Sequence, residues 1–171
     1  MDVFDAIRRR RSVRSFEDRP VEQEKLQQVL DAARRAPSAK NRQDWRFVVA
    51  QDEELRHKLM EAAHNQEFVG QAPVVLAACG IGTDYTMTCG QPAYLVDVSI
   101  ALDHITLAAR ALDLGTCWVG RFEQERVKEV LNIPDEVEVV ELMPLGYPSE
   151  WPDAPPRKPL DEIVYQDRWE N

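Results

Sequence analysis

A run of arginines near the N-terminus is the part of this sequence with the clearest capacity for chemistry. Residues 8–14 hold five arginines, in a chain whose formal net charge is -9. A guanidinium group presents planar, forked donors that match a carboxylate or a phosphate. A second cationic pair, Arg157 and Lys158, lies near the C-terminus. These two sites predict an anionic ligand that carries a phosphate at one end.

Two neutral segments supply further hydrogen-bonding groups. Residues 37–45 read as a polar loop rich in side-chain donors, and residues 115–122 read as an extended turn that contains Gly115 and Gly120. A ligand with a hydrogen-bonding ring beyond its phosphate suits this combination of charged and neutral groups.

Other common catalytic patterns are missing from the sequence. It contains neither standard phosphate loop, GxGxxG or GxxxxGK[ST], and no GxSxG. The cysteines and histidines show no CxxC pair and no metal-ligand spacing; they are Cys79, Cys89, Cys117, His57, His64 and His104. We therefore predict no metal site and no acid–base pair, and Cys89 is the one thiol with a neighbourhood typical of an exposed, reactive group.

The composition limits the expected partners. Thirty acidic residues against twenty-one basic ones argue against nucleic acid as the main partner. The sequence has no 18-residue uncharged apolar run and no apolar stretch near its N-terminus, so no membrane span and no signal peptide are predicted. These observations favour a soluble, cytoplasmic protein.

The elements that must position these groups alternate between helical and extended patterns. Val3, Phe4 and Ile7 form the expected apolar face of a first helix, and residues 92–114 predict a long helix that is apolar almost all round. Such a helix is buried in a core or in a subunit interface. Strands are expected over residues 46–50, 73–79 and 137–145.

The predicted fold class is α+β. We expect a small mixed β-sheet surrounded by helices, with the 92–114 helix buried at its centre. Residues 1–171 are expected to form a single domain that ends in a proline-rich arm, from about residue 148 to residue 171.

Four short motifs together resemble the nitroreductase-like flavoprotein family. Residues 10–16 look like its R-R-S-x-R-x-F signature, and residues 37–45 resemble its P-S-x-x-N-x-Q-P-W loop. Residues 114–120 are similar to its G-L-G-T-x-W-x-G turn, and residues 145–160 carry its L-G-Y-P and R-K-P-L pieces. Each motif alone is weak, but all four occur in the family's order and cover nearly the whole chain.

The resemblance implies the family's fold and chemistry. It implies FMN bound non-covalently, and an obligate homodimer with FMN at the subunit interface. It also implies a ping-pong reaction, in which NADH or NADPH is the electron donor and the flavin N5 passes a hydride to a small-molecule acceptor such as a nitroaromatic or a quinone. The flavin carries the hydride chemistry, so no protein side chain is expected to be catalytic.

The resemblance also implies which residues bind the cofactor. Arg10, Ser12 and Arg14, with Arg11 beside them, fall at the phosphate and the pyrimidine edge, and Arg157 and Lys158 fall at the C-terminal phosphate contact. The loop lent by the second subunit would supply Ser38, Ala39, Asn41 and Gln43. The segment against the ring would be Trp118, Val119 and Gly120. Gln66, with Asn65 as an equal candidate, lies near a pyrimidine contact. The backbone N–H of Gly120 is expected near N5.

One residue departs from the family pattern. Asp44 stands where the family usually has proline. Two interpretations are open: its charge lies beside the flavin and changes the reduction potential, or it points into solvent. The short chain leaves residues 80–92 as the available lid, with Tyr85 and Met87 near its middle.

Alternatives remain at the level of sequence. The arginine run is equally typical of a solvated helix face, which is our interpretation of Arg8 and Arg9. Trp118 and His104 are typical of core residues. At the level of function, the alternatives are a flavin-binding sensor or storage protein with little nicotinamide-driven turnover, and a flavin-free protein whose arginines bind an acidic protein or nucleic acid.

Overall fold

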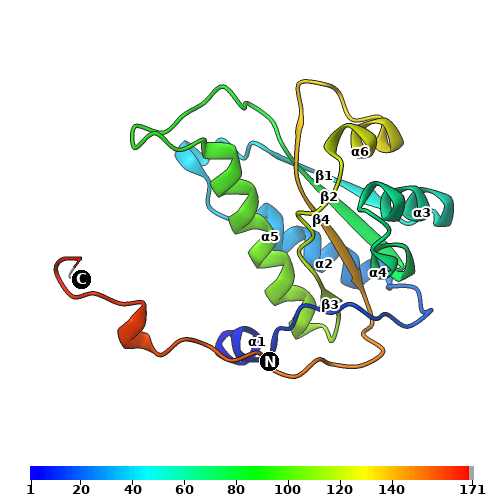
Figure 1. Cartoon of the computed structure of the whole chain (residues 1–171), viewed down its shortest axis with the longest axis horizontal. Coiled ribbons are helices and arrows are strands. Elements are labelled where there is room, and N and C mark those ends of the chain that lie inside the picture. The colour runs from blue at the N-terminus through cyan, green and yellow to red at the C-terminus, as the bar shows by residue number, and fades with distance from the viewer. Residues whose placement is uncertain (170–171) are drawn as a thin grey trace.

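A four-stranded antiparallel sheet lies at the centre of the computed structural model, which describes residues 1–169 (Figure 1). Its strands are β1 (Trp45–Ala50), β2 (Val74–Gly80), β3 (Gly115–Thr116) and β4 (Glu138–Gly146), in the order β1-β2-β4-β3. The α-helices are α1 (Val3–Arg9), α2 (Gln23–Arg34), α3 (Glu53–Ala62), α4 (Glu67–Gln71), α5 (Ala93–Ala111) and α6 (Gln124–Leu131). Two short 3-10 helices are η1 (Ala39–Asn41) and η2 (Leu160–Glu162).

The α+β class is confirmed, but the expectation of a mixed sheet is wrong. All three strand pairs are antiparallel. The parallel pairing in the described residues is an isolated bridge between Ser12 and Thr116. Apolar patterns identify strands, whereas strand direction depends on how the connections cross the sheet, and that is a tertiary property.

Strand β2 divides the core into two layers. All its residues are buried, and alternate side chains point to opposite faces. Val74, Leu76 and Ala78 pack in the cluster formed with α2 and α5, which we call the α5 face. Val75, Ala77 and Cys79 pack in the cluster formed with α3, α4 and α6. Figure 1 shows these helices on the two sides of the sheet.

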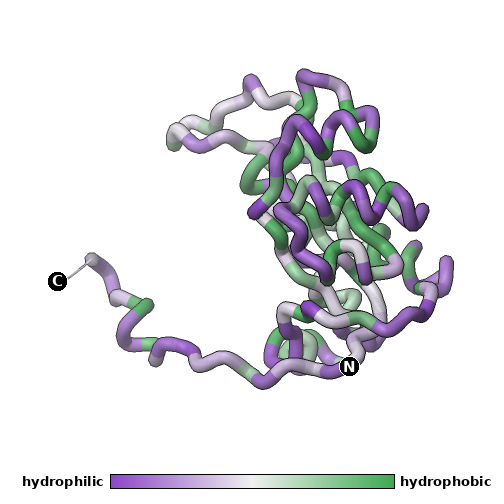
Figure 2. Tube along the Cα trace, turned by 45° about the vertical axis from the view of Figure 1, so that its right-hand side comes forward, coloured by the Kyte–Doolittle hydropathy of each residue, from purple (hydrophilic) through white to green (hydrophobic). Residues whose placement is uncertain are grey.

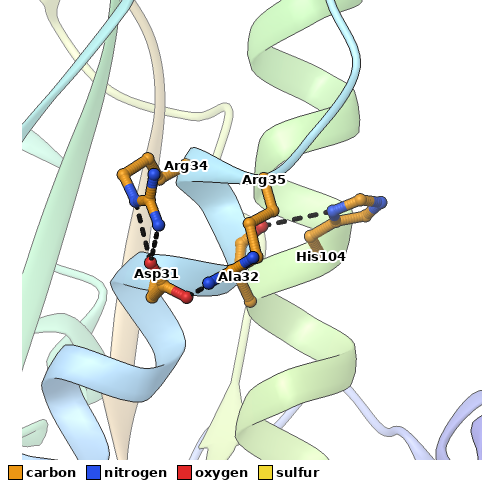
Figure 3. Close-up of polar contacts among 5 residues, drawn as sticks. All are labelled: Asp31, Ala32, Arg34, Arg35 and His104. Carbon is orange, nitrogen blue, oxygen red and sulfur yellow. Dashed lines mark hydrogen bonds and ion pairs between the residues drawn. The ribbon is translucent and has the colours of Figure 1, made fainter.

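Helix α5 is the long central helix, and its own chain buries most of it. Val98, Leu102 and Ile105 are fully buried against the sheet and α2. His104 is half-buried, with Nδ1 3.3 Å from the carbonyl oxygen of Ala32 (Figure 3). The residue before Ala32, Asp31, pairs with Arg34 and Arg35 one turn further along α2, on the solvent side (Figure 3). His104 is therefore a hydrogen-bonded packing residue between α2 and α5.

Helix α1 begins after its N-cap, Asp2, but leaves its predicted apolar face uncovered. Asp2 accepts a hydrogen bond from the Asp5 N–H at 2.9 Å, and the helix ends at Arg9. Ala6 is the buried residue, whereas Phe4 is 71% exposed and Ile7 is 53% exposed. Within residues 1–169, no segment covers that face.

The L-G-Y-P motif has a packing role. A Cβ on Gly146 would lie 2.5 Å from Cδ of Pro73, so no larger residue fits there without movement. The Tyr147 hydroxyl donates to Glu22 at 2.5 Å and accepts from Lys25 at 2.8 Å. This bond to Tyr147 is the main reason that the pKa of Glu22 is lowered to about 2. The motif thus fixes the start of the C-terminal arm against α2.

Beyond this motif, the arm leaves the body of the molecule. Residues 149–169 are exposed, and they extend past α1 (Figures 1 and 2). No helix in the described part of the chain is long and apolar enough to cross a bilayer.

Candidate functional site

The arginine segment lies along the free side of strand β3. Helix α1 ends because Arg10 adopts an extended ψ of 135°, and the following residues run beside β3. The Val13 N–H donates to the Thr116 carbonyl at 2.9 Å, and the Val13 side chain is fully buried. Because side chains alternate in extended chain, Ser12 and Arg14 point away from the core.

Five predicted residues share one pocket. Arg10, Arg11, Ser12 and Arg14 line a cavity of about 330 Å³ together with Arg157, Pro152, Asp153 and Pro155. The first part of the C-terminal arm closes this cavity over the arginine segment. Residues more than 140 positions apart in sequence, Arg14 and Arg157, thus face the same space.

The pocket carries an excess of positive charge. Within residues 1–169, no carboxylate forms an ion pair with Arg10, Arg14 or Arg157, and Asp153 is the only acidic group in the lining. Guanidinium groups without a carboxylate partner are available to an anionic ligand. A phosphate fits this set of donors.

Arg11 has a structural role in addition to its place in the pocket. Its Nη1 donates to the carbonyl oxygens of Arg8 and Arg10, at 2.7 and 2.8 Å. These carbonyls lie at the C-terminal end of α1, where helical acceptors have no intrahelical partner. Arg8 instead pairs with Asp5 at the surface, as expected for a solvated helix face.

Residues 117–119 continue the line of β3 and run antiparallel beside β4, with the Val119 side chain inside. Val119 is buried and exchanges backbone hydrogen bonds with Leu142, so its side chain and its polar groups are already engaged. Trp118 is half-buried against the α5 face. Gly120 is exposed, and no described residue accepts a hydrogen bond from its N–H. Of the three residues predicted here, Val119 has an engaged N–H, whereas no described residue accepts from the N–H of Trp118 or Gly120, and Gly120 is the exposed one.

Gln66 holds this segment in place. Its Nε2 donates to the carbonyl oxygens of Ala63 at 2.9 Å and Arg121 at 3.0 Å. The donor group expected at a pyrimidine ring is therefore engaged with the backbone next to Gly120. Asn65, the equal candidate, sits in the preceding turn with a φ of 55°.

The loop predicted to serve a second subunit satisfies many of its own polar groups. Ser38 Oγ accepts from the Gln43 N–H at 3.0 Å, and the Gln43 side-chain amide donates to Asn41. The Ala39 N–H donates to Oδ1 of Asp97 on α5 at 3.0 Å. Asp97 is 2% exposed, and its Oδ2 has no partner in the described residues.

This loop and the arginine pocket lie at opposite ends of α5. Asp97, which anchors the loop, is in the first turns of α5, whereas β3 and the arginine segment follow its last turn (Figure 1). A helix of 19 residues is about 28 Å long. One chain therefore does not bring Ser38, Ala39, Asn41 and Gln43 to the phosphate end of the pocket.

Asp44 does not point into solvent. Its Oδ2 pairs with Nε of Arg42 at 2.5 Å, and its side chain is 13% exposed. The Asp44 carbonyl accepts from the Ile81 N–H, and Arg42 also lies over the ring of Tyr85. The Asp44 carbonyl and the Arg42 guanidinium therefore tie the 38–44 loop to the 80–92 loop.

Lys158 lies outside the pocket. It is exposed and its Nζ is 3.7 Å from Glu162, which is a weak surface pair.

Cys89 is exposed, as expected, while burial raises the pKa of Cys79 to about 11. No cluster of His, Cys, Asp or Glu within residues 1–169 has the geometry of a metal site.

Two residues with unusual surroundings escaped the sequence analysis. Asp97 is one of two carboxylates on an apolar helix, and unlike Asp103 it is buried. Glu141 on β4 is half-buried, and desolvation raises its pKa to about 7. No sequence pattern separates Glu141 from the other acidic residues around β4.

Comparisons with known proteins show the family of this chain. The family model described as "Nitroreductase family" matches residues 7–67 and 60–147. The chain belongs to the nitroreductase family.

Individual relatives of this nitroreductase-family chain cover nearly all of it. An FMN reductase [NAD(P)H] from Bacillus subtilis is 33% identical, over 99% of this chain and 75% of its own length. The structure of a nitroreductase family protein from Clostridium difficile 630 is 36% identical, with a TM-score of 0.88, 99% of this chain covered and 100% of that one. The NADPH:FMN oxidoreductase from Vibrio harveyi, solved in complex with NAD+, is 27% identical, with a TM-score of 0.91, 99% of this chain covered and 78% of that one.

Proposed function

We propose that this nitroreductase-family chain is an NAD(P)H-dependent oxidoreductase that holds FMN non-covalently. The observation that carries the proposal is the group of unpaired guanidiniums, Arg10, Arg14 and Arg157, in one pocket. The names of its relatives, an FMN reductase and an NADPH:FMN oxidoreductase, support the same function. When bound, FMN would supply hydride transfer between the nicotinamide and an acceptor.

The residues of the pocket are proposed to bind and orient this cofactor. Arg10, Arg14 and Arg157 would neutralise its phosphate through charge-assisted hydrogen bonds, and Ser12 would donate its hydroxyl. The free N–H of Gly120 would fix one edge of the ring. None of these groups transfers a proton, which agrees with the absence of a catalytic dyad in the sequence.

We further propose that the functional unit is a homodimer in which each subunit lends residues 38–43 to the other. Two observations support it. In one chain this loop lies at the far end of α5 from the pocket. In addition, α1 and the arm expose large apolar side chains, among them Phe4, Leu160 and Ile163 (Figure 2). Exposed apolar groups of this extent are typical of protein interfaces.

The basis for this dimer differs from the one that the sequence suggested. The 92–114 pattern predicted a helix buried in a core or in a subunit interface. Its own chain covers most of α5, and its large apolar residues Leu95 and Val96 are 40% and 41% exposed. The uncovered apolar surface lies instead mainly on α1 and the arm.

The direct test is spectroscopic. We expect the purified protein to take up FMN, to show the flavin absorption bands, and to lose them anaerobically on addition of NADH or NADPH. A nitroaromatic or a quinone should then restore the bands. Bound FMN without nicotinamide reduction would support the sensor or storage alternative, and a protein that takes up no FMN would contradict the proposal.

A further inference from the structure

Glu141 is a carboxyl group in an unusual place. It lies on β4 opposite Ala78, whose side chain packs on the α5 face. Residues directly opposite in an antiparallel pair point to the same face, so the Glu141 side chain leaves the sheet on that side too. Its Oε2 and Oε1 lie 3.6 and 3.7 Å from the position that a Cβ on Gly120 would occupy.

No described group compensates the charge of Glu141. Within residues 1–169, its carboxylate has no hydrogen-bond donor and no ion-pair partner. Glu138, three residues earlier on the same strand, accepts from Gln124 at 2.8 Å and lies 3.8 Å from Nζ of Lys128. Glu138 therefore has a hydrogen-bond donor and a nearby cation, whereas Glu141 has neither in the described residues.

The other ionisable groups near Glu141 belong to the proposed cofactor site, to the segment after β3 and to helix α5. The Cys117 thiol is buried, and its pKa is raised mainly by desolvation; the charge of Glu141 raises it further, whereas Arg14 and Arg10 lower it. Cys117 thus feels both Glu141 and the arginine segment, whereas desolvation is the cause of the raised pKa of Glu141 itself. On α5, Asp97 is bonded to Ala39 and Tyr94 packs against Gly80, so neither neutralises Glu141.

Desolvation without a cation favours the neutral form of a carboxyl group. This is the reason that the pKa of Glu141 is about 7, so both forms are populated near neutral pH. A charge that changes in this range, directly behind Gly120, acts on whatever lies against the Gly120 backbone.

We propose that Glu141 sets the charge behind the ring-binding segment, and that its carboxylate takes up one proton from solvent when the cofactor is reduced. This inference rests on the proposed function, because it needs a flavin ring along residues 118–120. Reduction adds negative charge to the ring, and a carboxylate behind Gly120 opposes that charge. Reduction and protonation of Glu141 are thermodynamically linked. If the ionised carboxylate makes reduction less favourable, then reduction must increase the proton affinity of Glu141 by the same free energy. The two electrons come from the nicotinamide and the additional proton comes from water.

The test compares reduction potentials across pH in three proteins: the wild-type holoprotein, Glu141→Gln, and Glu138→Gln as a matched control on the same strand. In the wild type, one extra proton per two electrons makes the equilibrium constant for reduction tenfold less favourable per pH unit above pH 7, which is about 30 mV. Glu141→Gln should lack this component and have the higher potential at pH 8 and above. Glu138→Gln should follow the wild type. Parallel curves for the wild type and Glu141→Gln would overturn the inference.

A second measurement needs neither the cofactor nor an activity assay. Side-chain carboxyl NMR of the wild-type apoprotein, assigned with Glu141→Gln, should give a Glu141 midpoint near pH 7. A midpoint below pH 5 would also overturn the inference. A protein that fails to bind FMN contradicts the proposed function itself, whereas a flavoprotein reduced by NAD(P)H with unaltered pH dependence in Glu141→Gln contradicts the inference alone.

Discussion

At the scale of single residues, the arginines of one short run have separate tasks. Arg8 pairs with Asp5 on the surface, and Arg11 caps the carbonyl end of α1. Arg10 and Arg14 have no carboxylate partner and face the pocket that also contains Arg157. By composition alone the five arginines look equivalent. The change of backbone direction after Arg9 gives them different surroundings.

This division predicts different effects of removing each arginine. Arg14→Ala should weaken FMN binding by about 10- to 100-fold, because a hydrogen bond to a charged group contributes about 1.5–3 kcal/mol. Arg9→Ala, in α1 and outside the pocket, is the matched control and should bind FMN as the wild type does. Fluorescence titration of the apoprotein with FMN measures both affinities, and equal losses in the two variants would contradict the assignment.

Glu141 also predicts how stability changes with pH. Its pKa is about 7 in the folded protein and 4.5 in its ordinary range, so the folded state binds more protons between these values. The contribution of Glu141 to the free energy of unfolding is therefore fully present below about pH 4.5 and is lost as the pH rises to about 7.

The apoprotein variant Glu141→Gln should avoid this loss. Since water screens part of the effect at a half-buried group, we expect a gain of about 1 kcal/mol over the wild type at pH 8, or about 2–4 °C in Tm. Melting curves at pH 5 and pH 8 give the comparison. A Tm difference that is the same at both pH values would contradict this prediction.

At the scale of elements, the extended arginine segment depends on one close contact. A Cβ on Gly115 of β3 would lie 2.5 Å from Cγ2 of Val13, and both residues are buried. The glycine thus allows the segment to lie against the sheet with Ser12 and Arg14 facing the pocket. The G-T-x-W-x-G motif therefore places one glycine for packing and the other, Gly120, at the surface.

These two glycines should tolerate substitution differently. Gly115→Ala overpacks a buried contact and should cost about 1–3 kcal/mol, which lowers Tm by about 2–4 °C for each kcal/mol. Gly120→Ala meets only Glu141 oxygens at 3.6 Å or more, which is an ordinary contact, so its apoprotein Tm should stay close to that of the wild type. Similar losses in both variants would show that the contact with Val13 is not limiting.

At the scale of the whole molecule, the proposed site needs two chains. The pocket and the 38–43 loop lie at opposite ends of α5, and α1 and the arm offer apolar surface for a second copy. A dimer would cover Phe4 and Ile7 and bring the loop of one chain to the pocket of the other.

A mixed dimer tests this arrangement. Arg14→Ala removes a pocket residue and Asn41→Ala removes a loop residue, so each homodimer should have two weakened FMN sites. A heterodimer of the two variants, purified with two different tags, should contain one intact site and one site that lacks both residues. Titration should then show wild-type affinity at half the sites; weak binding at all sites would mean that each site is built within one chain.

The local sequence predicts a large part of the fold. The apolar runs at residues 46–50, 73–79 and 137–145 predict strands, and β1, β2 and β4 lie within a residue or so of these bounds. Helix α5 is also recognised, within a few residues at each end. These predictions succeed because side-chain periodicity and capping are local properties of the chain.

The candidate site is predictable only in part. Its motifs identified Arg10, Ser12, Arg14 and Arg157, which the structure brings into one pocket. The engaged amide of Gln66, the Arg42–Asp44 pair and the exposed face of α1 were not predictable, because each depends on what a neighbouring segment presents.

By itself, the sequence determined the kinds of element and the residues able to meet a phosphate, since these follow from local spacing and side-chain chemistry. Only the tertiary structure decided that all strand pairs are antiparallel, that Arg11 caps a helix, and that Glu141 lies behind Gly120 without a cation. The charge state of Glu141 depends on the water and the counter-charges that folding removes from it. Such surroundings are assembled from distant segments, and no local pattern records them.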